Sequence, residues 1–79
     1  MTRIEILGSG CNNCVRLEKH AREAVALAGI DAEVVKVTDY AEIMRYGILS
    51  TPGLVIDGRV MSHGRVPAPS DIVAWLRPR

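Results

Sequence analysis

Apolar positions in the first half of the chain change from strand-like to helix-like spacing and back. Thr2 to Leu7 is short, rich in isoleucine and followed by Gly-Ser-Gly, which predicts a strand that ends in a loop. Between Asn12 and Ala28, apolar residues recur at intervals of three and four with charged residues between them, which predicts an amphipathic helix that Gly29 terminates. Ala32 to Thr38 contains three valines and is too short for a typical helix, so a second strand is predicted.

A short helix is predicted next, over Tyr40 to Tyr46. Asp39 is suited to its N-cap, and Glu42 falls at the third helical position, where its carboxylate can reach back to the cap in a capping box. Met44 is expected to pack within this helix, beside Tyr40 and Ile43.

A hairpin and a last helix complete the pattern. Leu54 to Asp57 and Arg59 to Ser62 flank the dipeptide Asp-Gly, which favours a tight turn between antiparallel strands. Ser70 is expected to cap the last helix. Its buried stripe would consist of Ile72, Trp75 and Leu76.

The predicted order of elements is β-α-β-α-β-β-α. Two strands joined through a helix are expected to pair in parallel with a right-handed crossover, whereas the last two form an antiparallel hairpin. The sequence therefore predicts an α/β fold, with one four-stranded mixed sheet covered by helices on both faces. Residues 1–79 are expected to form a single domain.

Composition excludes several classes of function. The 79 residues carry ten Lys and Arg against nine Asp and Glu, a net charge of +1, and only three aromatic side chains, so nucleic-acid binding is not expected. The longest apolar run, Ala24 to Ile30, is far shorter than a membrane span. Glu5 is acidic where a secretion signal would be apolar, so we expect a cytoplasmic protein that does not associate with membranes.

The two cysteines are three residues apart, in Cys11-Asn12-Asn13-Cys14. Two thiols this close in a reducing compartment indicate disulfide exchange or metal binding. Cys11 lies where a glycine-flanked loop meets a helix, and the free amides of a helix N-terminus stabilise a thiolate. Cys11 is therefore the expected nucleophile, and Cys14, on the same face one turn later, the more buried resolving thiol.

A structural zinc site needs four ligands, and the chain adds only His20, on the solvated side of the first helix, and His63, in a distant turn. No structural metal or other cofactor is expected. The cysteines alone leave a second possibility open, a carrier that binds Cu(I) or arsenite through two thiolates.

A second motif lies forty residues downstream, in Ser50-Thr51-Pro52-Gly53, followed by an apolar strand and the Asp-Gly turn. Together with a first strand that ends in Cys-X-X-Cys, this motif resembles the thioredoxin/glutaredoxin superfamily, and most closely the small redox-active disulfide proteins of archaea and bacteria. The resemblance spans nearly the whole chain. It implies a thioredoxin-like fold and a thiol–disulfide oxidoreductase that acts on disulfides of protein targets and is re-reduced by a flavin- or iron–sulfur-dependent reductase.

The resemblance also implies roles for individual residues. Pro52 matches the family's cis-proline, which packs against the disulfide, and Thr51 would present its backbone to an extended substrate segment. Gly64 matches a glycine that lets the substrate backbone approach. The expected substrate-binding residues are Asn12, Asn13, Ser50, Thr51, Pro52, His63 and Gly64.

Glu5 lies six residues before Cys11, where thioredoxins carry a buried carboxylate that relays a proton to or from the resolving cysteine. The resemblance thus implies that Glu5 accepts the proton of Cys14. The alternative from the residues themselves is a carboxylate at the sheet edge that points to water or pairs with Lys36.

Overall fold

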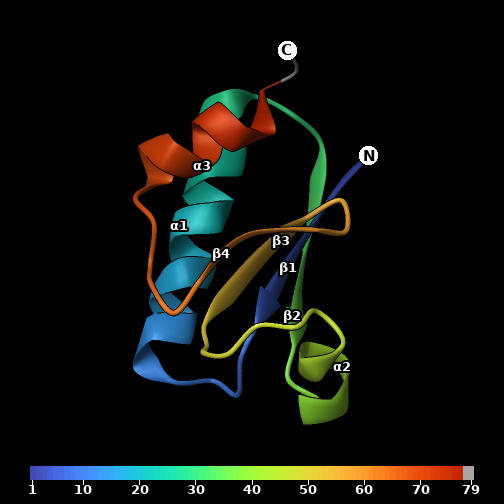
Figure 1. Cartoon of the computed structure of the whole chain (residues 1–79). Coiled ribbons are helices and arrows are strands. Elements are labelled where there is room, and N and C mark those ends of the chain that lie inside the picture. The colour runs from blue at the N-terminus through green and yellow to red at the C-terminus, as the bar shows by residue number, and fades with distance from the viewer. Residues whose placement is uncertain (78–79) are drawn as a thin grey trace.

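A computed structural model describes residues 1–77, and their elements follow the predicted order (Figure 1). The elements are β1 (Thr2–Leu7), α1 (Asn12–Ala28), β2 (Ala32–Val37), α2 (Tyr40–Met44), β3 (Gly53–Ile56), β4 (Arg59–His63) and α3 (Pro69–Leu76). None of the helices in this part of the chain is both long enough and apolar enough to cross a lipid bilayer.

The four strands form one mixed sheet in the order β2-β1-β3-β4. β1 pairs in parallel with β2 and antiparallel with β3, and β3 pairs antiparallel with β4. β1 is therefore an inner strand, hydrogen-bonded along both edges, and the loop that carries the cysteines leaves from its end. This arrangement confirms the predicted four-stranded mixed sheet.

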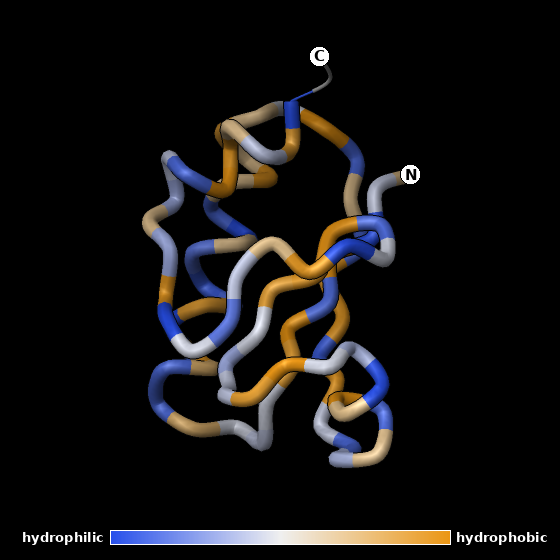
Figure 2. Tube along the Cα trace, in the orientation of Figure 1, coloured by the Kyte–Doolittle hydropathy of each residue, from blue (hydrophilic) through white to orange (hydrophobic). Residues whose placement is uncertain are grey.

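Helices cover both faces of the sheet, as predicted. α1 and α3 lie on one face and α2 lies on the other, at the lower right of Figure 1. Ile4 and Ile6 of β1 pack with Leu17 of α1 and Ile72 of α3, whereas Leu7 packs on the α2 side. In Figure 2 the most hydrophobic segments follow the strands through the centre of the trace. Alternate residues of β1 thus point to different helices.

The helix termini depart from prediction at two places. α2 begins after Asp39, whose carboxylate accepts a hydrogen bond from the Ala41 amide at 3.1 Å, but it ends at Met44, two residues before the predicted end. α3 begins at Pro69, one residue before the predicted cap Ser70, and its N-cap Ala68 offers no side-chain bond. A proline suits the first helical turn because it has no amide hydrogen to leave unpaired.

Met44, His20 and His63 lie in other environments than predicted. Met44 was expected to pack, but it is 50% exposed and the neighbouring Tyr40 is 73% exposed, because only Ile43 of the short α2 reaches the core. His20, expected in solvent, is half-buried, and its Nδ1 atom lies 3.0 Å from the Pro67 carbonyl oxygen. His63 is the last residue of β4 and not part of a distant turn.

Trp75 is only half-buried, although it was predicted to belong to the core stripe. It packs against the core from its periphery. The guanidinium of Arg65 lies over its ring, 5.9 Å from the centroid, which is within range of a cation–π interaction.

Candidate active site

Cys11 and Cys14 form a disulfide across the first turn of α1, with their Cα atoms 5.0 Å apart. Their exposure differs sharply: Cys11 is exposed, whereas only 5% of Cys14 is accessible. A reagent or protein approaching from solvent therefore reaches the sulfur of Cys11 first.

Cys11 is also the N-cap residue of α1. Its backbone is extended, and its Sγ atom accepts a hydrogen bond from the Cys14 amide at 3.2 Å. Its carbonyl accepts the first helical bond, from the Val15 amide at 3.0 Å. A sulfur at this position faces the positive end of the helix dipole and unpaired amide hydrogens, which favour negative charge. The local geometry thus suits a thiolate on Cys11.

Gly8, the residue directly after β1, lies close to both Cys14 and the loop that contains Thr51. A Cβ atom on Gly8 would collide with Cys14 Sγ and lie 3.8 Å from the Cβ atom of Thr51. The absence of a side chain at Gly8 therefore allows the sulfur and the Thr51 loop to approach the strand together. The Gly-Ser-Gly sequence predicts a loop here, but it does not predict that Cys14 Sγ packs against Gly8.

The loop before β3 contributes Ser50, Thr51 and Pro52. The Thr51–Pro52 peptide bond is cis; Thr51 is exposed and Pro52 is buried. The Gly64 amide donates a hydrogen bond to the Pro52 carbonyl at 2.9 Å, and a Cβ atom on Gly64 would collide with the Ser50 hydroxyl. Gly64 and the Ser50–Pro52 loop are therefore held together. His63 lies alongside, paired with Gly53.

Asn12 and Asn13 are the first two residues of α1. Both are exposed, between the two cysteines. The structure thus gathers at one end of the sheet all the residues expected at the site except Glu5.

Glu5 lies on the other face of the sheet. It alternates with Ile4 and Ile6, which face α1, so its side chain is directed towards the α2 face. There its carboxylate, 12% exposed, accepts a hydrogen bond from the Tyr46 hydroxyl and pairs with Arg3 Nε at 3.4 Å. This hydrogen bond raises the pKa of Tyr46 above its ordinary value, and burial adds to the effect.

The sheet therefore separates Glu5 from Cys14, which lies on the α1 face, and the proton relay expected of Glu5 has no geometric support. The alternative partner, Lys36, is engaged elsewhere. Its ammonium lies 3.6 Å from the carboxylate of Glu18. Neither interpretation of Glu5 included its actual partners. Arg3 is two residues away on the same face of β1, whereas Tyr46 is brought to Glu5 by the fold of the chain.

A small cavity of about 100 Å³ lies beside Cys14 on the α1 face. Gly8, Cys14, Glu18 and Lys36 are among its lining residues. Glu18 is not among the site residues predicted from the sequence; it also forms an ion pair with Arg22 at 3.0 Å. The signal that could have identified it is the spacing of four residues between Cys14 and Glu18, which places both on one face of the helix.

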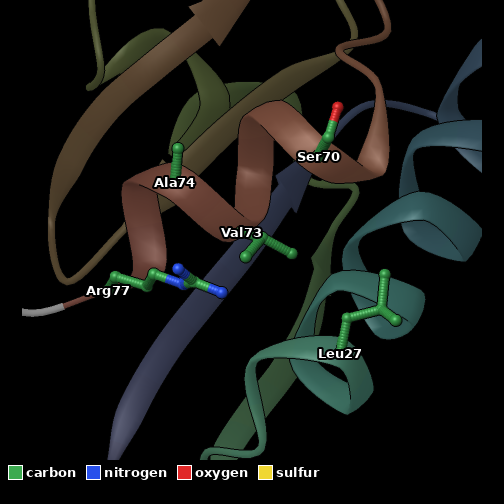
Figure 3. A pocket seen from close by; sticks show the side chains of 5 residues that line it. All are labelled: Leu27, Ser70, Val73, Ala74 and Arg77. Carbon is green, nitrogen blue, oxygen red and sulfur yellow. The ribbon is translucent and has the colours of Figure 1, made fainter.

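A larger and more open pocket, of about 610 Å³, lies between the end of α1 and α3 (Figure 3). Its lining residues are Leu27, Ser70, Val73, Ala74 and Arg77. Because α1 rises about 1.5 Å per residue, this pocket is at the far end of the helix from the cysteines. It forms no part of their site.

Comparisons with known proteins agree with this geometry. The family described as Thioredoxin domain matches residues 2–77. A thioredoxin of Methanothermobacter thermautotrophicus is 46% identical over 72 residues, covering 91% of this chain and 94% of the relative. A thioredoxin of Methanocaldococcus jannaschii is 39% identical over 77 residues, covering 98% of this chain and 88% of the relative. The chain therefore belongs to the thioredoxin family and is a thiol–disulfide oxidoreductase.

Proposed function

We propose that this oxidoreductase reduces disulfides of protein targets with Cys11 as the attacking thiol and Cys14 as the resolving thiol. The observation that carries the assignment is the asymmetry of the pair. Cys11 is exposed and its sulfur accepts a hydrogen bond from a helix amide, whereas Cys14 is buried and its sulfur packs against Gly8. Nothing observed favours the alternative of a soft-metal carrier.

In the first step the Cys11 thiolate attacks one sulfur of the target disulfide. A bond forms between Cys11 Sγ and that sulfur, the target's S–S bond breaks, and the second target sulfur leaves as a thiolate. The Cys14 amide, which donates a hydrogen bond to Cys11 Sγ and stabilises the thiolate, also keeps that sulfur in place for attack.

In the second step the Cys14 thiolate attacks Cys11 Sγ. The Cys11–Cys14 bond forms, the mixed disulfide breaks, and the target's first sulfur leaves as a thiolate, so that the target has gained two electrons and the protein has lost two. The first helical turn already places the two Cα atoms 5.0 Å apart, so this step needs no rearrangement of the backbone.

The target segment binds, in this proposal, between the start of α1 and the Ser50–Pro52 loop. Thr51 is exposed beside the cysteines and presents its backbone to an extended segment, as an added strand would pair with an edge. Asn12 and Asn13 border the segment on one side. His63 and Gly64 border it on the other, where Gly64 offers no side chain to obstruct the approach.

The oxidised pair is returned to the dithiol by a flavin- or iron–sulfur-dependent reductase. A cycle of this kind operates in a compartment that keeps thiols reduced, so we place the protein in the cytoplasm. The near-neutral charge and the small number of aromatic side chains support protein targets rather than nucleic acids.

Substitution of each cysteine tests the assignment. We expect Cys14→Ser to retain a target protein covalently on Cys11, detected as a complex that a reductant dissolves. We expect Cys11→Ser to form no such complex, because its remaining thiol is buried. Equal trapping by both variants would contradict the roles given to the two sulfurs.

A further inference from the structure

The resolving thiol has to lose its proton before it can attack, and it has little access to bulk water. Only 5% of Cys14 is accessible, and Gly8 packs directly against its sulfur. Glu5, where the family resemblance implies a carboxylate for this purpose, is on the other face of the sheet. A different group must therefore receive the proton.

The cavity beside Cys14 leads to such a group. Glu18 lines it together with Cys14, and the spacing of four residues places their Cβ atoms about 5–6 Å apart on one face of α1. A volume of about 100 Å³ is ample for a water molecule, which needs roughly 10–15 Å³ measured in the same way, and a carboxylate and an ammonium offer it partners. A general base can act through one such water.

The carboxylate of Glu18 retains a free acceptor site. Its Oε2 atom accepts a hydrogen bond from Arg22 at 3.0 Å. Its Oε1 atom lies 3.6 Å from Lys36 Nζ, which is close enough for an ion pair and too far for a hydrogen bond. The side chain of Glu18 is 19% exposed, so it also has contact with bulk water, to which a proton can be passed.

We propose that Glu18 is the proton acceptor for Cys14, through a water molecule in this cavity. The Cys14 S–H bond breaks, its proton passes through the water to Glu18 Oε1, and the thiolate attacks Cys11 Sγ. Glu18 then releases the proton to solvent or to the departing target thiolate. The ion pair with Lys36 from β2 holds the carboxylate in place beside the cavity. This inference rests on the proposed order of attack, with Cys11 first.

Stopped-flow reaction of the reduced protein with an aromatic disulfide tests the two proposals separately. The first release of coloured thiolate reports attack by Cys11, and the second reports resolution by Cys14. In Glu18→Gln we expect an unchanged first phase and a second phase slowed about tenfold at neutral pH, less than the roughly 100-fold or more of a direct general base. The difference should vanish at alkaline pH, where hydroxide ionises Cys14 directly.

Two further variants separate proton transfer from a structural role. Arg22→Gln removes the other ion-pair partner of Glu18 and leaves its carboxylate, so we expect the second phase to keep the parental rate. Glu23→Gln removes an exposed carboxylate from the same helix and is the matched control. A Glu18→Gln second phase with the parental rate and pH profile, or an equal loss in Arg22→Gln, would overturn the proposal. A first phase absent from the parent protein would instead contradict the role of Cys11.

Discussion

Substitution of Gly8 by alanine probes the contact on which the active site is built. The added Cβ atom would occupy space that Cys14 Sγ now fills, and it would also touch the Cβ atoms of Cys14 and Thr51, at 3.4 and 3.8 Å. Nonbonded atoms of this size need about 3.5 Å or more. The start of α1 and the end of β1 must therefore move apart for the methyl group to fit.

Gly8→Ala should lower the free energy of unfolding because it overpacks a buried position. Forcing one extra methyl into a well-packed site costs about 1–3 kcal/mol. In urea, where a small protein has a slope of about 1 kcal/mol per molar, the unfolding midpoint should fall by about 1–3 M. The displaced Cys14 should also resolve mixed disulfides more slowly, which the second phase of the stopped-flow reaction measures.

The adjacent Ser9→Ala is the matched control, because Ser9 is exposed and the change adds no atoms. Its free energy of unfolding should stay within about 0.5 kcal/mol of the parent's. If Gly8→Ala unfolds at the parental midpoint and resolves mixed disulfides at the parental rate, the close approach of Cys14 to β1 does not control the site.

Three further changes test the fold around the site. Because its hydroxyl donates a hydrogen bond to Glu5, Tyr46 should ionise above its ordinary pKa of 10.0 in an absorbance titration. This hydrogen bond stabilises the fold below that pH, and the stabilisation is lost as the pH rises through the raised pKa. Glu5→Gln should lower the pKa of Tyr46 towards its ordinary value. Asp39→Ala removes the α2 cap and should cost about 1 kcal/mol in urea unfolding, whereas no loss would mean that the cap bond is not formed. Leu17→Ala empties a fully buried position and should cost about 2–5 kcal/mol in the same assay; a smaller loss would indicate that the core closes over the gap.

Local sequence patterns were sufficient to predict the elements of the fold. The bounds of β1 and α1 agree with prediction, because alternation, helical spacing and Gly29 act over a few residues. The errors concern termini and exposure. Ser70 resembled a cap, but Pro69 already fits the first turn of α3, and Met44 looked apolar enough to pack although α2 is too short to cover it.

The site was predictable where residues are close in sequence or belong to the family motif. Cys11, Cys14 and the Ser50–Pro52 loop are such cases. The contacts of Glu5 with Tyr46 and of Glu18 with Lys36 depend on which helix covers which face of the sheet, and no local pattern contains that information. Glu5 therefore lies beside Tyr46, and Glu18 lies beside Lys36 and lines the cavity next to the buried Cys14.

The position of β1 between β2 and β3 has a consequence for how the protein moves while it works. A strand bonded along both edges opens only when most of the domain opens, so its amides should be among the last to exchange with deuterium. The Cys11 loop starts directly from this strand. β1 can thus stay rigid during turnover, and only the two sulfurs and their immediate neighbours need to shift between the oxidised and reduced states.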